Sequence, residues 1–166
     1  MKRKIYQQLL DWKEKRNGEV ALLIEGARRI GKSYIVEEFG KNEYESYILI
    51  DFNKAPQIVR DWFDLYLEDL DMLFLYLSQH YKVRLHERKS LIILDEVQLC
   101  PRARAAIKFL VKDGRYDYIE TGSLVSIKKN TQGIVLPSEE RPIQMYPMDF
   151  EEFLWATGND MLMDLI

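Results

Sequence analysis

The sequence predicts an α/β fold of three layers, in which a mainly parallel five-stranded sheet carries helices on both faces. Two observations lead to this fold class. Short apolar segments typical of buried strands lie at residues 20–24, 46–51, 91–94, 116–121 and 143–146. Segments with helical spacing separate most of them, and strands that alternate with helices pair in parallel through right-handed crossovers. The 166 residues, 47% of them hydrophobic, can bury one substantial core.

The first elements follow from apolar spacing and from glycine. Apolar residues at helical intervals predict an amphipathic helix over residues 4–16, which Asn17 and Gly18 end before the first strand. A second helix is predicted from Lys32 to Phe39, with Tyr34, Ile35, Val36 and Phe39 on one side. Gly40 suits the position just past its end.

The middle of the chain predicts one strand and two helices. Residues 46–51 form a short buried strand that ends in Asp51. Helical patterns rich in leucine and aromatic residues follow at residues 57–66 and 69–81. Their aromatic residues keep the helical period, so we expect them in the core and not around a ligand.

The last elements surround the most hydrophobic run of the chain. Residues 91–94, Leu-Ile-Ile-Leu, predict a strand covered on both faces. A helix over residues 102–112 follows and ends at Asp113 and Gly114. Strands over residues 116–121 and 143–146 complete the sheet.

Residues 26–33, Gly-Ala-Arg-Arg-Ile-Gly-Lys-Ser, match the pattern GxxxxGK[ST] between a predicted strand and a predicted helix. Backbone N–H groups of such a loop, with the N-terminal end of the next helix, bind phosphate oxygens. Lys32 would reach the β- and γ-phosphates, and the Ser33 hydroxyl would coordinate Mg²⁺. We therefore expect nucleotide contacts from the loop and the residue after it: Gly26, Ala27, Arg28, Arg29, Ile30, Gly31, Lys32, Ser33 and Tyr34.

Two adjacent carboxylates end the most hydrophobic strand and predict the second half of a hydrolysis site. Asp95 would face the metal, and Glu96 would orient or deprotonate an attacking water. Successive residues at a strand end point in different directions, so the two carboxylates can have different roles. Because ligands bind beyond the carboxyl ends of parallel strands, we expect this pair to lie near the phosphate loop.

Three further residues are candidates for catalysis. Thr121 and Ser123 follow the next strand and could place a hydroxyl between the γ-phosphate and the attacking water; a turn that caps itself uses the same residues. Arg141 could reach the transferred phosphate of a neighbouring subunit and neutralise the charge of the transition state. The alternative for Arg141 is a solvated side chain paired with Glu139 or Glu140.

The motif at residues 26–33, with Leu-Asp-Glu-Val-Gln at 94–98, Tyr-Ile-Glu-Thr-Gly-Ser at 118–123 and Tyr-Pro-Met-Asp-Phe-Glu-Glu-Phe-Leu at 146–154, resembles the prokaryotic AAA-superfamily ATPases of the AAA_14 type. The double arginine before Ile-Gly-Lys is also similar to archaeal ATPases of the related STAND group. The resemblance implies a P-loop NTPase core with the phosphate-loop strand central, and ATP and Mg²⁺ as ligands. It implies phosphate and metal contacts from Lys32, Ser33 and Asp95, with Glu96 beside them and Thr121 or Ser123 as the sensor.

The resemblance covers residues 4–155 and also sets an expectation about domains. We expect an ATPase domain over residues 1–155 and, over residues 156–166, the start of a truncated lid or C-terminal domain, because members of the family usually continue into one. Such a domain would be a partner absent from this chain, and closure over the nucleotide would depend on it. Homo-oligomers are a further expectation.

Three functions stay open at the level of sequence: a Mg²⁺-dependent ATPase that drives a conformational change, a nucleotide-dependent switch that binds DNA or protein with little turnover, and a small-molecule kinase. The adjacent acids favour water as the acceptor.

A net charge of −3 gives no overall attraction to nucleic acid, although a basic face is conceivable at Lys108, Lys112, Arg115, Lys128 and Lys129. The lone Cys100 and the absence of a leader or of a long apolar run favour a cytoplasmic protein without membrane contact.

Overall fold

The computed structural model describes residues 4–27, 30–123 and 138–146 and confirms the α/β fold class. The helices and strands lie along the chain in the order α1 (Lys4–Arg16), β1 (Ala21–Gly26), α2 (Lys32–Glu43), β2 (Ser46–Asp51), α3 (Gln57–Leu65), α4 (Leu70–Tyr81), β3 (Ser90–Asp95), the short 3₁₀ helix η1 (Val97–Leu99), α5 (Pro101–Asp113), β4 (Asp117–Ser123) and β5 (Glu140–Gln144). Local signals explain several of the ends. The side chain of Asp69 caps α4 by accepting from the Met72 N–H, and α5 begins at a proline and ends at Gly114.

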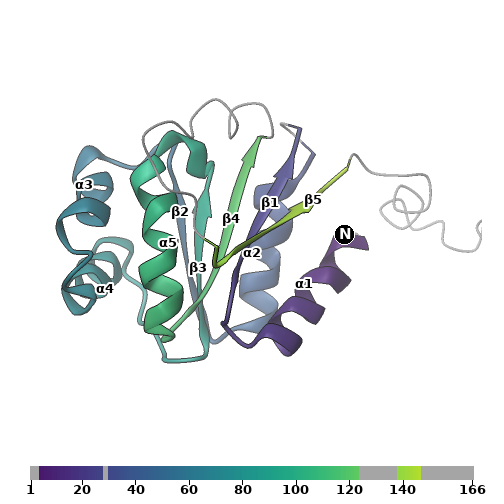
Figure 1. The fold of residues 1–166 in the computed structure, drawn as a ribbon, viewed down its shortest axis with the longest axis horizontal. Coiled ribbons are helices and arrows are strands. Elements are labelled where there is room, and N and C mark those ends of the chain that lie inside the picture. The colour runs from purple at the N-terminus through teal and green to yellow at the C-terminus, as the bar shows by residue number, and fades with distance from the viewer. Residues whose placement is uncertain (1–3, 28–29, 124–137, 147–166) are drawn as a thin grey trace, which may run out of the picture.

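The five strands form one sheet in the order β2-β3-β4-β1-β5, and all four neighbouring pairs are parallel. In this order β4 holds the middle position, so the expectation that the phosphate-loop strand is central is wrong. That strand, β1, is an inner strand between β4 and β5. The parallel pairing brings the carboxyl ends of β1, β3 and β4 to one edge of the sheet (Figure 1).

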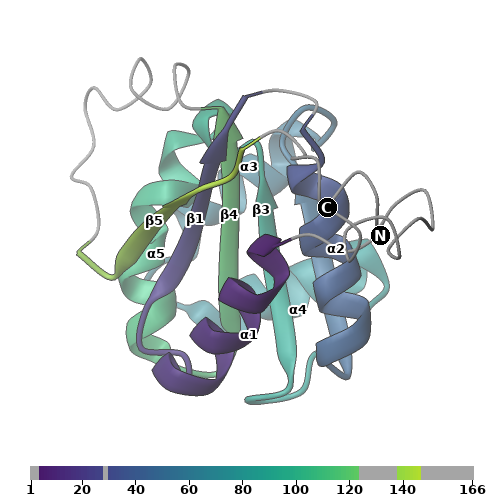
Figure 2. The same cartoon turned by 90° about the vertical axis from the view of Figure 1, so that its right-hand side faces the viewer.

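Helices cover both faces of the sheet, as Figure 2 shows from the side of β5. The helices α3, α4 and α5 pack on one face, where their apolar residues share a core with apolar residues of β2, β3 and β4. The helices α1 and α2 pack on the opposite face, against apolar residues of β1 and β3. All six residues of β3 are buried, as its apolar run predicts for a strand with both faces covered.

Three details of the predicted elements are wrong. Helix α2 continues past Gly40 to Glu43. A Cβ at position 40 would come within 3.1 Å of the Tyr47 side chain, which explains why this position inside the helix is a glycine. Tyr34 is 55% exposed and does not share the buried side of α2 with Phe39. The last strand begins at Glu140, three residues before the predicted start, because its pairing with β1 begins there.

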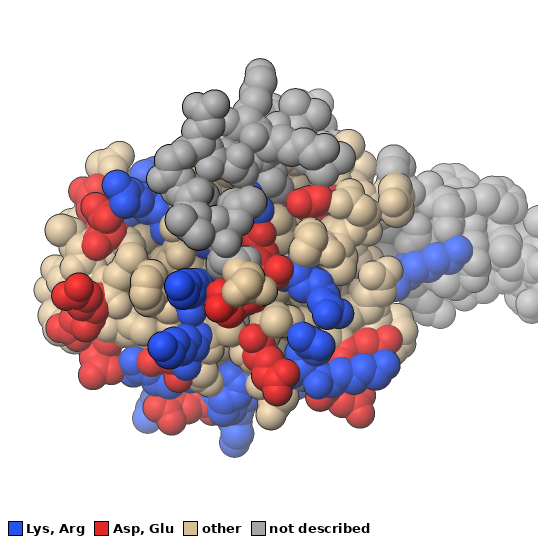
Figure 3. All heavy atoms as spheres, in the orientation of Figure 1, with Lys and Arg blue, Asp and Glu red and all other residues tan. Residues whose placement is uncertain are grey.

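Three of the five residues of the basic face considered from the sequence, Lys108, Lys112 and Arg115, lie in the described part of the chain. Arg115 is paired with Asp113 and with Asp71, so it does not extend a basic surface with Lys108 and Lys112. On the face drawn in Figure 3, basic and acidic side chains are interspersed. Lys128, Lys129 and the predicted segment 156–166 lie outside the described residues. Within the part of the chain that the structure describes, no helix combines the length and the apolar character that a membrane crossing requires.

Candidate functional site

The described part of the loop between β1 and α2, residues 27 and 30–31, has the left-handed glycine that a phosphate-binding loop uses before its helix. Gly31 adopts a left-handed conformation with φ 92°, which a glycine reaches without strain, and α2 begins at the next residue. The Lys32 ammonium group is almost fully buried and donates to the carbonyl oxygens of Gly26 (3.0 Å) and Ala27 (2.9 Å). The lysine therefore folds back over its own loop, which places a positive charge where phosphates would enter.

Three side chains from α2, β3 and β4 meet at the carboxyl edge of the sheet. The hydroxyl of Ser33 donates to Asp95 Oδ1 at 2.7 Å, and the hydroxyl of Thr121 donates to the same oxygen at 2.5 Å. The pairing of β3 with β4 explains this meeting, because it brings the ends of the two strands together beneath the first turn of α2. The oxygens of Ser33 and Asp95 are hard donors of the kind that Mg²⁺ prefers, so the residues present fit this ion.

Glu96 follows Asp95 in a strained conformation. Its φ of 55° and ψ of 52° lie in the left-handed region, which a residue with a side chain occupies at a cost of about 1–3 kcal/mol. Its N–H donates to the Thr121 hydroxyl at 3.0 Å, and its carboxylate accepts from Gln98 Nε2 at 2.6 Å. Thr121 thus links both acids, and Gln98 fixes the direction of the Glu96 carboxylate.

The environment of Asp95 disfavours its charge. Burial raises the pKa of the Asp95 carboxyl, the hydrogen bonds from Thr121 and Ser33 oppose the increase, and the charges of Asp51 and Glu96 add to it. Because the pKa in the folded chain lies above the value in the unfolded chain, the folded chain binds more protons. The stability that this group contributes therefore falls as the pH rises through the folded pKa.

Asp95→Asn is accordingly expected to raise the free energy of unfolding of the nucleotide-free chain at neutral pH. The amide oxygen can still accept from Ser33 and Thr121, whereas the buried charge is removed. Urea denaturation in EDTA would measure the difference, which should shrink at acidic pH as Asp95 of the native chain becomes protonated. A variant less stable than the native chain at neutral pH would contradict the prediction.

The other candidate residues lie at varied distances from this cluster. Ser123 pairs with Gly26 in the register of β4 and β1, directly beside the start of the phosphate loop. Arg141 lies in β5 opposite Leu22, toward the other end of β1. For the alternative, pairing with Glu139 or Glu140, no ion pair of Arg141 is found among the described residues: Glu140 binds Arg104, and Glu139 accepts from Ser138. Arg28 and Arg29 lie outside the described residues.

Sequence reasoning missed two features of this region. The contact of Gln98 with Glu96 was not expected, although Gln98 stands two residues after the acid in one of the motifs. A buried charged group also lies on the opposite face of the sheet, where Arg104 of α5 makes two hydrogen bonds to Glu140 of β5, near the fully buried Glu120. No local sequence pattern predicts this buried charged group, because its members are distant in the chain.

The phosphate loop, the sheet order and the strand-end acids together define a nucleotide-binding domain of the P-loop type. A family model described as an AAA domain, AAA_14, matches residues 19–154, so the chain belongs to this family of nucleotide-binding, ATPase-type domains. The resemblance seen in the sequence motifs is thereby confirmed.

Two similar proteins add context. Uncharacterized protein MJ1637 of Methanocaldococcus jannaschii is 27% identical over 141 residues, which are 83% of this chain and 28% of the relative. The structure of PCH-2 from C. elegans matches 98% of this chain and 43% of that one, with 14% identity and a TM-score of 0.41. The chain thus spans less than half the length of either protein.

Proposed function

We propose that the chain binds ATP with Mg²⁺ and hydrolyses it to ADP and phosphate. The observation that carries the proposal is the meeting of Ser33, Asp95 and Thr121 through two short hydrogen bonds, with Glu96 directly beside them. This arrangement supplies both a place for a metal ion next to a phosphate loop and a carboxylate for an attacking water.

The phosphate loop would hold the triphosphate. Its backbone N–H groups and the N-terminal end of α2 favour negative charge, and Lys32 would exchange its two carbonyl partners for phosphate oxygens. Ser33 and Asp95 would hold Mg²⁺, which neutralises charge on the phosphates when it is bound. A bound Mg²⁺ would also offset the cost of burying ionised Asp95.

Glu96 would act on the water. Its carboxylate can accept a proton or orient the nucleophile, and Gln98 restricts the directions that the carboxylate can take. In this structure the Thr121 hydroxyl is bound to Asp95, so we assign Thr121 the positioning of the two acids. Ser123, beside Gly26, is the better placed of the two hydroxyls for a contact with the γ-phosphate.

The wider function is also a proposal. Hydrolysis would drive a conformational change in a C-terminal domain or partner, in a cytoplasmic protein. Arg141 does not join the cluster of its own chain, so we assign it no part in hydrolysis there.

Phosphate release from ATP tests the proposal. Release by the purified chain is expected with Mg²⁺ and is expected to fall to background when EDTA removes the ion. Lys32→Met should reduce release at least tenfold, because the buried ammonium group at the loop is lost, while the exposed Lys108→Met should not. Tight ATP binding without release would contradict hydrolysis and favour the nucleotide-dependent switch. Release that requires an added acceptor would favour the kinase.

A further inference from the structure

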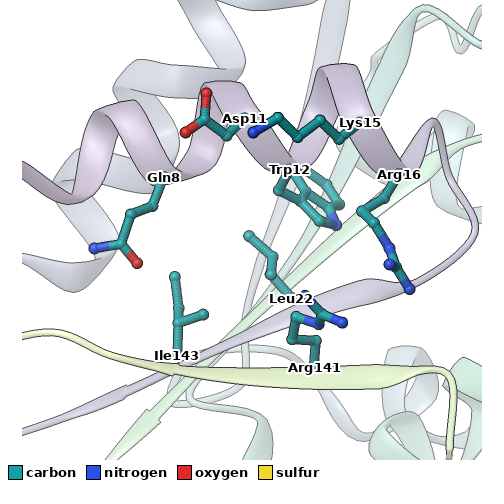
Figure 4. Close-up of a pocket in the computed structure, with 8 residues that line it drawn as sticks. All are labelled: Gln8, Asp11, Trp12, Lys15, Arg16, Leu22, Arg141 and Ile143. Atoms are coloured by element: carbon teal, nitrogen blue, oxygen red, sulfur yellow. The ribbon is translucent and has the colours of Figure 1, made fainter.

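A second pocket lies between α1 and the strands β1 and β5, away from the phosphate loop (Figure 4). Its volume is about 280 Å³, near the lower end of the range for small-molecule sites. The residues that line it come from three elements: Gln8, Asp11, Trp12, Lys15, Arg16, Leu22, Arg141 and Ile143. Arg141 pairs with Leu22, four residues before Gly26, which is roughly 13 Å along the strand at 3.3 Å per residue.

The pocket gathers positive charge in a chain whose net charge is −3. Figure 4 shows the side chains of Arg16 and Arg141 extending toward each other from α1 and β5, whereas Lys15 extends along α1 toward Asp11. Among the described residues, neither arginine has an acidic partner within ion-pair distance. The Nε of Arg16 is enclosed and has no hydrogen-bond partner within that part of the chain. Within the described ranges, the two guanidinium groups therefore face each other with no carboxylate paired to either.

Besides the polar Gln8 and Asp11, the rest of the lining consists of three apolar side chains, from Trp12, Leu22 and Ile143. Trp12 is buried, and its Nε1 donates to the Val20 carbonyl at 2.9 Å, which holds the ring between α1 and β1. Leu22 and Ile143 belong to neighbouring strands of the sheet and line the opposite side. The ligand chemistry that suits this lining is an anionic head joined to an apolar body.

We propose that this pocket binds a small organic anion, with a phosphate or carboxylate between Arg16 and Arg141 and an apolar body against Trp12, Leu22 and Ile143. Guanidinium groups bind both anions through pairs of charge-assisted hydrogen bonds, which accounts for two arginines at one place. The site is separate from the phosphate loop and does not depend on hydrolysis of ATP.

The indole N–H signal of Trp12 in a nuclear magnetic resonance titration of the full chain tests the proposal. The probes are phenyl phosphate, benzoate and the neutral benzyl alcohol, added in the presence of saturating Mg²⁺ and ADP so that the phosphate loop does not take the anions. Phenyl phosphate or benzoate is expected to shift the Trp12 signal to saturation, and benzyl alcohol to bind at least tenfold more weakly. The Trp62 signal comes from a side chain on the opposite face of the sheet, packed with α3, α4 and α5. It should not move, and it reports on intact folding.

Variants distinguish anion binding by Arg16 and Arg141 from a general effect of positive charge on the protein. Arg16→Gln and Arg141→Gln should each weaken binding of the anionic probe at least tenfold. Arg84→Gln removes an exposed arginine outside the pocket and should leave binding unchanged. The proposal is overturned if no anionic probe shifts the Trp12 signal to saturation, if benzyl alcohol binds as tightly as the anions, or if Arg84→Gln weakens binding equally. Because Trp12 lines this pocket, its signal reports on the pocket and not on the phosphate loop. These outcomes therefore do not depend on whether the chain hydrolyses ATP.

Discussion

Replacing Glu96 with glutamine is expected to slow phosphate release from ATP by about 10²- to 10⁴-fold, the usual contribution of a general base. Glutamine keeps the size of the side chain and can still contact Gln98, but it cannot take a proton from water. Binding of ATP should persist, because the loop, Lys32 and Ser33 are unchanged. Steady-state phosphate release, together with calorimetric titration of a non-hydrolysable ATP analogue, measures the two effects separately.

The matched control is Glu68→Gln, which makes the same chemical change at an exposed position outside the cluster. This variant should hydrolyse ATP at the native rate. Equal rates for Glu96→Gln and the native chain would remove Glu96 from the reaction. Loss of analogue binding in Glu96→Gln would instead point to a damaged site, because Glu96 stands in a strained conformation that its neighbours must hold.

The sequence predicts the fold well because its strands and helices have strongly periodic patterns. The run at residues 91–94 is apolar throughout, and the structure buries it on both faces. Prediction fails where a residue serves packing instead of local conformation. Gly40 has the chemistry of a helix end, yet it lies within α2 to admit the Tyr47 ring, which belongs to another element.

In the candidate site, too, local motifs are predictable from the sequence, whereas contacts between distant elements are not. The motifs lead to the expectation that Ser33 and Asp95 lie close together, and the structure shows this contact. The target of the Thr121 hydroxyl was not predictable, because it depends on which face of β4 the side chain occupies and on the pairing with β3. Sequence spacing alone determines neither of these.

Buried charge is the feature that the sequence conceals most completely. Glu120 follows an apolar stretch and would be expected at a solvated strand end, yet its side chain is fully buried. Burial raises the pKa of the Glu120 carboxyl well above its usual range, and the charge of Glu140 raises it further. This shift favours the neutral form of Glu120, and Arg104 and Glu140 form an ion pair next to it.

Replacing Arg104 with methionine is expected to lower the free energy of unfolding by about 3–5 kcal/mol, the usual cost of removing one partner from a buried ion pair. Arg104 donates from Nε and Nη2 to the two carboxylate oxygens of Glu140, at 3.0 and 2.7 Å, and both side chains are more than nine-tenths buried. Without the arginine, Glu140 would be left as an unpaired buried charge. Urea denaturation at neutral pH measures the loss.

Two controls separate the ion pair from packing. Arg102→Met changes the same helix two residues away, where the arginine and Asp64 are largely exposed at 3.5 Å, and should cost less than about 1 kcal/mol. The double variant Arg104→Met with Glu140→Leu removes both charges and should recover most of the stability, because an apolar replacement of a buried pair is often neutral. A double variant as unstable as Arg104→Met would show that the shape of the arginine, and not its charge, joins α5 to β5.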